Sequence, residues 1–125
     1  MRINNFKELE IWRLSIDLAI DIYKTCSPKN FCNDYSLVDQ IRGAIVSVSS
    51  NIVEGFEKNN NKEFIRYLTI AKGSLGEVRN QLEIAYRLNY ISESKFKDLD
   101  EKSLALSYKI GGFIRYLKLN IENKK

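Results

Sequence analysis

Hydrophobic residues recur every three or four positions along most of the chain, which is the spacing of one face of an α-helix. Short polar segments separate four such stretches, and strand-like alternation is scarce. We therefore predict helices over residues 6–27, 36–57, 61–89 and 93–121. Because short connections favour antiparallel neighbours, the expected fold is all-α, an up-down-up-down four-helix bundle forming one domain over residues 1–125.

Polar residues near the start of each stretch are candidate helix caps. Asn5 is followed three residues later by Glu8, which is the spacing of a capping box. Asn60 precedes the third helix in the same way, and Ser36 and Ser92 are the candidate caps of the second and fourth helices. These caps support the predicted boundaries.

The first helix is apolar on two nearly opposite faces. The main stripe, expected to face the core, consists of Leu9, Trp12, Ile16, Ala19, Ile20, Tyr23 and Cys26. The second stripe consists of Ile11, Leu14, Leu18 and Ile22. Since a helix that is apolar nearly all round is buried nearly all round, we predict that this second stripe contacts another subunit of a homo-oligomer. The alternative is a scatter of surface apolar residues, which any protein carries.

The composition is that of an ordinary globular protein, with 44% hydrophobic and 29% charged residues. No apolar run is long enough to cross a bilayer, and the first residues lack the apolar centre of a secretion signal. We therefore expect a cytoplasmic protein without membrane contact. In that compartment Cys26 and Cys32 are expected to be free thiols rather than a disulfide.

The chain contains no histidine. This removes the commonest general base, the usual partner of a nucleophilic serine and the commonest zinc ligand. Two cysteines alone cannot complete a structural zinc site. The sequence therefore predicts a protein that is not an enzyme and that uses no metal or cofactor.

The positive charge is concentrated in the second half of the chain. Residues 1–60 carry a net charge of −1, and residues 61–125 carry a net charge of +5. The basic residues on one broad sector of the third helix are Lys62, Arg66, Lys72, Arg79 and Arg87. Arg115 and Lys118 add to them in the last helix. Such a face suits a phosphate backbone, so RNA or DNA is a candidate partner, although a merely solvated helix face is the alternative.

Polar residues also lie beside the apolar stripes of the second and third helices. They are Gln40, Ser47, Asn51, Glu54, Ser74, Glu77 and Gln81. We interpret them as a polar seam whose interhelical hydrogen bonds fix the helix register. The catalytic alternative has Ser47 or Ser50 as nucleophile and Glu54 or Glu77 as base, but no residue is well placed to activate a serine. Gly55, at the end of this stretch, is expected to end or loosen the second helix.

Several motifs together resemble one known family. They are LEIW (residues 9–12), QIRGAIVSVSSNIVEG (40–55), AKGSLGE (71–77), LEIAYRLNYIS (82–92) and the KIGGFIRYL ending (109–117). In this order they resemble the proteins encoded in intervening sequences of bacterial 23S ribosomal RNA genes, a family related to the accessory variability protein of diversity-generating retroelements. Gly43 and Val48 depart from the family pattern, which usually has a large or basic residue and often a proline at these positions.

The resemblance implies an antiparallel four-helix bundle that assembles into a positively charged homopentameric barrel with a central channel. It also implies, for the retroelement relatives, binding to nucleic acid and to a reverse transcriptase. It supplies no catalytic residue. Our leading hypothesis is therefore a non-enzymatic, pentameric accessory protein that binds RNA or DNA, and the rival is a scaffold that recruits a partner protein. A third hypothesis is an enzyme that uses Glu54 and Glu77.

Overall fold

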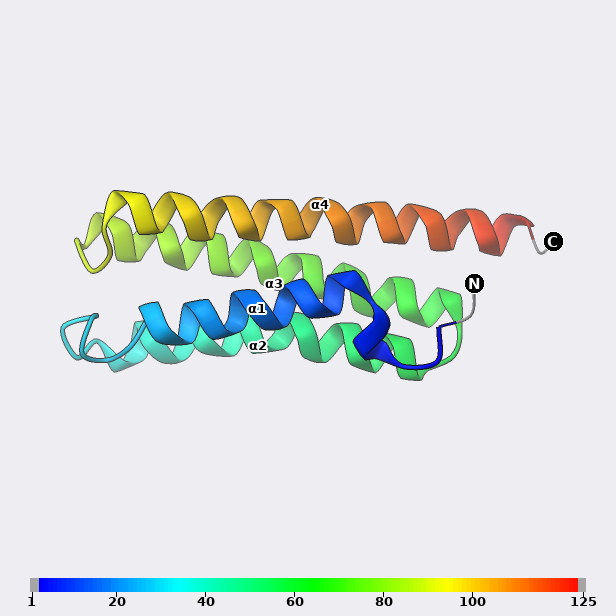
Figure 1. The fold of residues 1–125 in the computed structure, drawn as a ribbon, viewed down its shortest axis with the longest axis horizontal. Helices are drawn as coiled ribbons and strands as arrows, with labels where there is room; N and C mark the ends of the chain where they lie inside the picture. Colours follow the sequence, from blue (N-terminus) through cyan, green and yellow to red (C-terminus); the bar gives the residue numbers. More distant parts are fainter. Residues whose placement is uncertain (1–2, 124–125) are drawn as a thin grey trace.

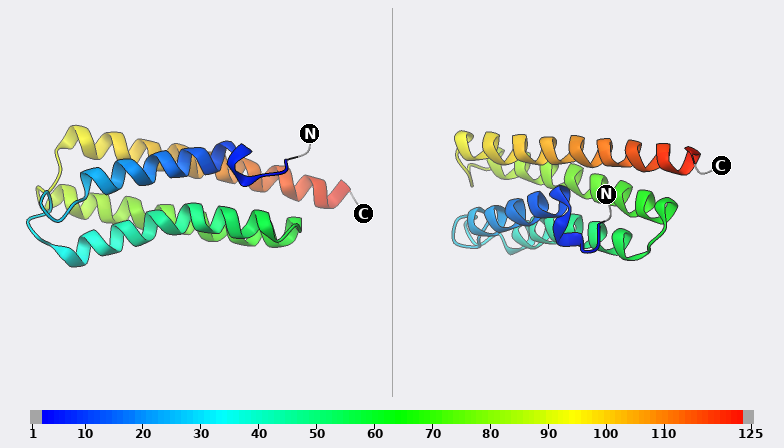
Figure 2. Two further views of the ribbon diagram at one scale, coloured as in Figure 1. Left: turned by 60° about the horizontal axis from the view of Figure 1, so that its bottom comes forward. Right: turned by 45° about the vertical axis from the view of Figure 1, so that its right-hand side comes forward.

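The computed structural model describes residues 3–123 and folds them into four long antiparallel helices (Figure 1). The elements are η1 (Phe6–Glu8), a 3-10 helix, and the α-helices α1 (Glu10–Thr25), α2 (Tyr35–Glu57), α3 (Asn61–Arg87) and α4 (Glu93–Asn123). Each α-helix packs against two neighbours, in the circular order α1, α2, α3, α4 (Figure 2). This confirms the predicted four-helix bundle, with no strand in the described part. None of the described helices combines the length and the apolar character needed to cross a membrane.

The first helix is shorter than predicted because the helical conformation is interrupted at Leu9. The capping box of Asn5 and Glu8 forms, but it caps η1. Leu9 then adopts an extended conformation, with φ −77° and ψ 126°, and its side chain is buried in the core. As a result α1 has 16 residues and α4 has 31, so α4 runs well past the start of α1 (Figure 1).

The other helices begin at short polar side chains. Asn60 and Ser92 act as predicted, each accepting a hydrogen bond of 3.1 Å from a backbone N–H three residues later. The second helix instead uses Asp34, whose Oδ1 accepts from the Leu37 N–H at 3.1 Å, and not Ser36. Beyond the ends of α2 and α3, Asn59 and Asn89 have φ values of 55° and 62°, a left-handed conformation that asparagine tolerates.

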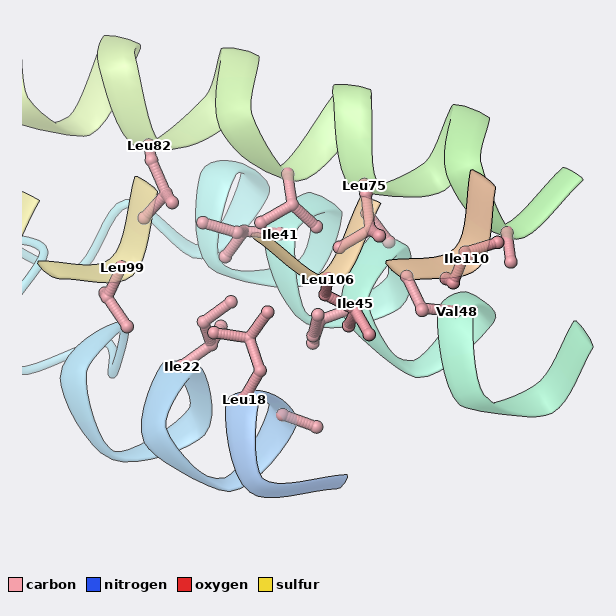
Figure 3. Close-up of a cluster of buried hydrophobic side chains, with 14 of the residues drawn as sticks. Leu18, Ile22, Ile41, Ile45, Val48, Leu75, Leu82, Leu99, Leu106 and Ile110 are labelled. Atoms are coloured by element: carbon pink, nitrogen blue, oxygen red, sulfur yellow. The ribbon is translucent and has the colours of Figure 1, made fainter. Parts of the chain in front are cut away.

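The core lies between the four helices and is almost entirely aliphatic. In Figure 3, Leu18 and Ile22 of α1 point toward Ile41 and Ile45 of α2, with Leu75 of α3 and Leu106 of α4 in the same cluster. The prediction for the first helix was therefore wrong about which stripe faces inward. The stripe assigned to a subunit interface consists of Ile11, Leu18 and Ile22, which are buried within the single chain, and Leu14, which is half-buried against the same core.

The stripe expected in the core is split. Leu9, Ala19 and Cys26 are buried, but 53% of Ile20 and 40% of Tyr23 are exposed. The orientation of α1 also matches the ion pairs that its carboxylates make with α4. Asp21 Oδ1 lies 2.8 Å from Lys95 Nζ. Periodicity within α1 could not indicate this choice, because both of its stripes are apolar.

Gly55 lies inside α2 and does not end it. It is buried, and a Cβ at this position would lie 2.8 Å from Phe64 Cδ1 and 2.9 Å from Tyr67 Cβ, both in α3. Only a residue without a side chain allows α2 and α3 to approach this closely. The interpretation of Gly55 as a helix terminator was therefore wrong, and its role is close packing.

The two cysteines are both free thiols. Cys26 is buried, and burial raises the pKa of its thiol to about 12. Cys32 is exposed in the loop between α1 and α2. The buried thiol is therefore protonated at neutral pH and packs as a small apolar group.

Candidate nucleic-acid interface

Arg79 does not present a free positive charge. Its Nε donates to Asp100 Oδ1 at 2.8 Å and its Nη2 donates to Asp100 Oδ2 at 3.3 Å. These two bonds join α3 to α4, and the bond to the Asp100 carboxylate raises the pKa of Arg79. A bidentate pair of this kind is strong and specific. Arg79 is therefore better placed to hold two helices together than to bind a phosphate.

Arg66 and Arg87 are also paired, but within α3 itself. Arg66 Nε lies 3.1 Å from Glu63 Oε2, and Arg87 Nε lies 3.0 Å from Glu83 Oε2. Both arginines are exposed, and such pairs on a helix surface contribute only about 0.3–0.5 kcal/mol. A phosphate could compete for these two arginines far more easily than for Arg79.

Two of the predicted basic residues converge between α3 and α4. Lys72 Nζ lies 3.3 Å from the point that a Cβ on Gly111 would occupy, and Arg115 Nη1 lies 3.6 Å from the same point. Lys72 Nζ also donates to the carbonyl and hydroxyl oxygens of Ser107, both at 3.3 Å. Neither cation forms an ion pair with a side chain of residues 3–121. We call Lys72 and Arg115 the cation pair.

Two glycines of α4 lie directly beside the cation pair, in which Arg115 is exposed and Lys72 is half-buried. Arg115 Nη2 lies 3.6 Å from the point that a Cβ on Gly112 would occupy, so the guanidinium lies along the surface of both glycines. A larger residue at either position would contact one of the two cations. The surface therefore combines positive charge with an absence of side-chain bulk.

The two other predicted basic residues are exposed. Lys62 lies in the first turn of α3, and Lys118 lies in the last turns of α4. Neither forms an ion pair with a side chain between residues 3 and 121. The predicted basic residues thus divide into carboxylate-paired arginines and four cations that are not neutralised within this range.

The polar seam between α2 and α3 consists of three hydrogen-bonded residues. Ser47 Oγ and Ser74 Oγ lie 3.0 Å apart across the two helices. Asn51 Nδ2 donates to the Ser47 carbonyl oxygen at 2.7 Å and to Ser47 Oγ at 3.0 Å. The seam is thus an uncharged network that links the two helices at one level.

The remaining seam candidates lie elsewhere. Gln40, Glu54 and Glu77 are exposed, and Glu54 lies 3.8 Å from Lys58 within α2. Gln81 is buried, and its Oε1 has no hydrogen-bond partner in the described part. The partners of the Ser47 hydroxyl are a serine and an asparagine, so no base is in place to make it a nucleophile. Among the side chains of residues 3–121, no group of three acidic or cysteine residues is placed to hold a metal ion.

Exposed apolar residues gather on the outer side of α1 and α2. Arg42 of α2 donates to the Tyr23 carbonyl of α1 at 2.9 Å, and its guanidinium lies 4.4 Å from the centre of the Tyr23 ring. Ile20 lies one turn before Tyr23, and Val46 lies one turn after Arg42 on the antiparallel helix, so the two are level. Exposed fractions are 53% for Ile20, 40% for Tyr23 and 41% for Val46. We call these three residues the α1/α2 patch; sequence analysis missed it because it assigned two of them to the core.

Comparison with known proteins agrees with the fold. The chain is similar to a crystal structure of a protein with unknown function from the S23 ribosomal protein family of Bacteroides thetaiotaomicron, with a TM-score of 0.75 and 22% identity over 83% of this chain and 97% of that one. No curated protein gives a significant match. The family model described as 23S rRNA-intervening sequence protein matches residues 7–112. The chain therefore belongs to the 23S rRNA-intervening sequence protein family.

Proposed function

We propose that this chain is a non-enzymatic, homo-oligomeric accessory protein that binds RNA or DNA through phosphate contacts centred on the cation pair. The observation that carries the proposal is the convergence of Lys72 and Arg115 over Gly111, without an ion pair to any side chain of residues 3–121. A cationic site that no carboxylate neutralises is the kind of site that a phosphate backbone occupies.

The geometry around the cation pair suits a phosphate. Among the described residues the Lys72 ammonium makes two long hydrogen bonds, of 3.3 Å each to Ser107, so it can reorient toward a ligand at little cost. The Arg115 guanidinium is planar and can bind two phosphate oxygens at once. Gly111 and Gly112 remove the bulk that would hold a phosphate away.

The other basic residues have graded parts in this proposal. Lys62 and Lys118 are exposed and extend the positive surface. Arg66 and Arg87 contribute when a phosphate displaces Glu63 or Glu83. Arg79 makes no phosphate contact, because its guanidinium is committed to Asp100 in two hydrogen bonds.

The assembly would use the α1/α2 patch in place of the buried stripe of α1. A second copy of this chain is its proposed occupant, and the family resemblance makes five copies the expected number. Light scattering of the Ile20→Glu, Val46→Glu double variant should give the mass of a monomer. Ile84→Glu changes an equally exposed apolar residue on α3 and should leave the mass unchanged. A double variant that keeps the full mass would exclude the patch as the interface.

Nucleic-acid binding is tested by charge reversal in two matched pairs. The Lys72→Glu, Arg115→Glu variant should lose at least about tenfold in affinity for RNA and DNA at low salt, measured by fluorescence anisotropy. Lys24→Glu with Lys29→Glu makes the same change in net charge at exposed lysines of the α1–α2 end of the bundle, far along the helices from the cation pair, and it should lose less than about threefold. Equal losses of affinity in both variants would mean that only the net charge of the protein matters, and they would contradict binding at the cation pair.

A second candidate function is a scaffold that recruits a partner protein, such as a reverse transcriptase, and does not itself bind nucleic acid. Its support is a set of exposed apolar residues along α3, where Ile70 and Ile84 are each 42% exposed and Leu88 is 50% exposed. If the wild-type protein fails to bind RNA or DNA even at low salt, the scaffold becomes the better account.

A further inference from the structure

At one end of the bundle α4 runs past the start of α1 (Figure 1). A cavity of about 680 Å³ lies at this end. Because the helical conformation is interrupted at Leu9, α1 has 16 residues, whereas α4 has 31. The last turns of α4 therefore extend beyond α1 and are not covered by it. Residues of the α2–α3 turn, of the chain before α1 and of the last turns of α4 line the cavity. Its volume falls in the range of small-molecule binding sites.

One wall of the cavity is aromatic. The Phe64 and Phe113 rings have their centres 5.4 Å apart, and Tyr116 meets Phe113 edge to face at 6.0 Å. Phe56 meets Phe64 edge to face on the other side, at 6.2 Å. Tyr116 lines the cavity and is 60% exposed, so much of its side chain is accessible to a ligand.

The rest of the lining is partly aliphatic, from Ile3, Leu9, Leu117 and Ile121, and partly polar, and it carries no carboxylate. It includes the side-chain amides of Asn59, Asn61 and Asn120, none of which makes a hydrogen bond within the described part of the chain. Lys62 is the cation of the lining, and it forms no ion pair with any side chain from residue 3 to 121. The cavity thus offers an aromatic surface, paired amide donors and acceptors, and one positive charge.

A ligand that matches all three features is planar, has alternating hydrogen-bond donors and acceptors at its edge, and carries an anionic group nearby. We propose that the end cavity binds an unpaired base of a single-stranded nucleic acid. The base stacks on Tyr116, its edge meets the amides of Asn61 and Asn120, and its phosphate lies toward Lys62. Stacking on aromatic side chains with contacts to exposed base edges is the usual way in which proteins bind unpaired nucleotides.

This inference rests on the proposed function and deepens it. Phosphate contacts alone do not distinguish single-stranded from duplex nucleic acid, and the end cavity adds a preference for single strands. The polar part of the lining argues against an occupant that is apolar all round, such as the apolar face of a helix from a second copy. Such an occupant would bury the side-chain amides of Asn59, Asn61 and Asn120, which have no hydrogen-bond partner in the described part of the chain, and each unsatisfied polar group is costly.

The experiment compares a short single-stranded RNA with a blunt duplex of the same sequence, using fluorescence anisotropy at constant salt. Tyr116→Ala should weaken single-strand binding by about fivefold or more and leave duplex binding unchanged. Tyr116→Phe keeps the ring and should bind like the wild type. Tyr108→Ala is the matched control, because Tyr108 is 68% exposed on the same helix and lies outside the cavity.

The outcomes separate this inference from the proposed function. If the wild type binds both probes and Tyr116→Ala binds the single strand as tightly as the wild type does, the cavity assignment fails while the phosphate contacts stand. If Tyr108→Ala weakens the single strand as much as Tyr116→Ala does, the effect is general to the surface and the assignment also fails. If the wild type binds neither probe at low salt, the proposed function and this inference fail together.

Discussion

The α2–α3 contact and the α1–α4 contact hold the same bundle together by different chemistry. Between α2 and α3, Gly55 allows close approach and Ser47 bonds Ser74 at 3.0 Å. Between α1 and α4, Asp21 lies 2.8 Å from Lys95 Nζ and 3.3 Å from Lys102 Nζ. A cavity of about 330 Å³ lies along the α1–α4 contact. The α2–α3 contact instead combines close helix packing at Gly55 with uncharged hydrogen bonds.

This difference predicts which conditions should weaken each contact. Steric fit and neutral hydrogen bonds respond little to salt or mild acid, whereas exposed and half-buried ion pairs respond to both. We therefore expect the α2–α3 pair to form the rigid half of the domain and the α1–α4 contact to be its adjustable half.

The largest expected effect is at Gly55. Gly55→Ala puts a Cβ within 3.3 Å of the Phe64 backbone as well as against the Tyr67 Cβ, so the helices must separate. The free energy of unfolding should fall by about 2 kcal/mol in denaturant titration. Gly76→Ala, at an α3 position with nothing within 4 Å, should instead gain up to about 1 kcal/mol from helix propensity. A gain at both positions would mean that close approach at Gly55 is unimportant.

The polar seam should give a smaller effect. Asn51→Leu removes the donor to Ser47 and should lower the free energy of unfolding by about 1 kcal/mol, because it leaves the Ser47 carbonyl oxygen and hydroxyl without that bond. Glu54→Ala is the control on the same helix, since Glu54 is exposed, and it should change stability by less than about 0.5 kcal/mol. Nucleic-acid affinity of the folded Asn51→Leu protein should equal that of the wild type; a selective loss of binding would return the seam to the list of functional sites.

The ion pairs of α1 and α4 should give a pH-dependent effect of similar or smaller size. Burial alone would raise the pKa of Asp21, but its hydrogen bonds to Lys95 and Lys102 outweigh burial and hold that pKa below the usual value of 3.8. Because the folded-state pKa is the lower one, the stabilisation is fully present above about pH 4 and is lost as the pH falls through the folded-state pKa. Asp21→Asn should therefore cost up to about 1 kcal/mol at pH 7 and almost nothing in strong acid.

The control for this pair is Asp17→Asn, on the same helix. Asp17 forms no ion pair with a side chain of residues 3–121, so its loss should change stability little at any pH. High salt should shrink the effect of Asp21→Asn and leave that of Gly55→Ala unchanged. If the loss of stability in Asp21→Asn changes with neither pH nor salt, the proposed distinction between the α1–α4 and α2–α3 contacts is wrong.

The fold class could be predicted from periodicity because each helix buries a continuous stripe. The orientation of α1 could not, since both of its stripes are apolar and the partner of Asp21, Lys95, lies in α4, far away in the sequence. Whether the guanidinium of Arg79 is free or paired also depends on a residue of another helix, Asp100 in α4. The end cavity could not be predicted for a related reason. It arises because the helical conformation is interrupted at Leu9, and only the folded chain shows how far α4 extends beyond the start of α1.

The most direct test of the account is the salt dependence of RNA binding by the wild type and by the Lys72→Glu, Arg115→Glu variant. For single-stranded RNA, each lost phosphate contact should lower the slope of log affinity against log salt concentration by about 0.7. The account predicts a slope that is smaller by about 1.4 in the double variant, for two lost contacts. An unchanged slope would contradict it, because the cation pair would then make no contact with the phosphate backbone.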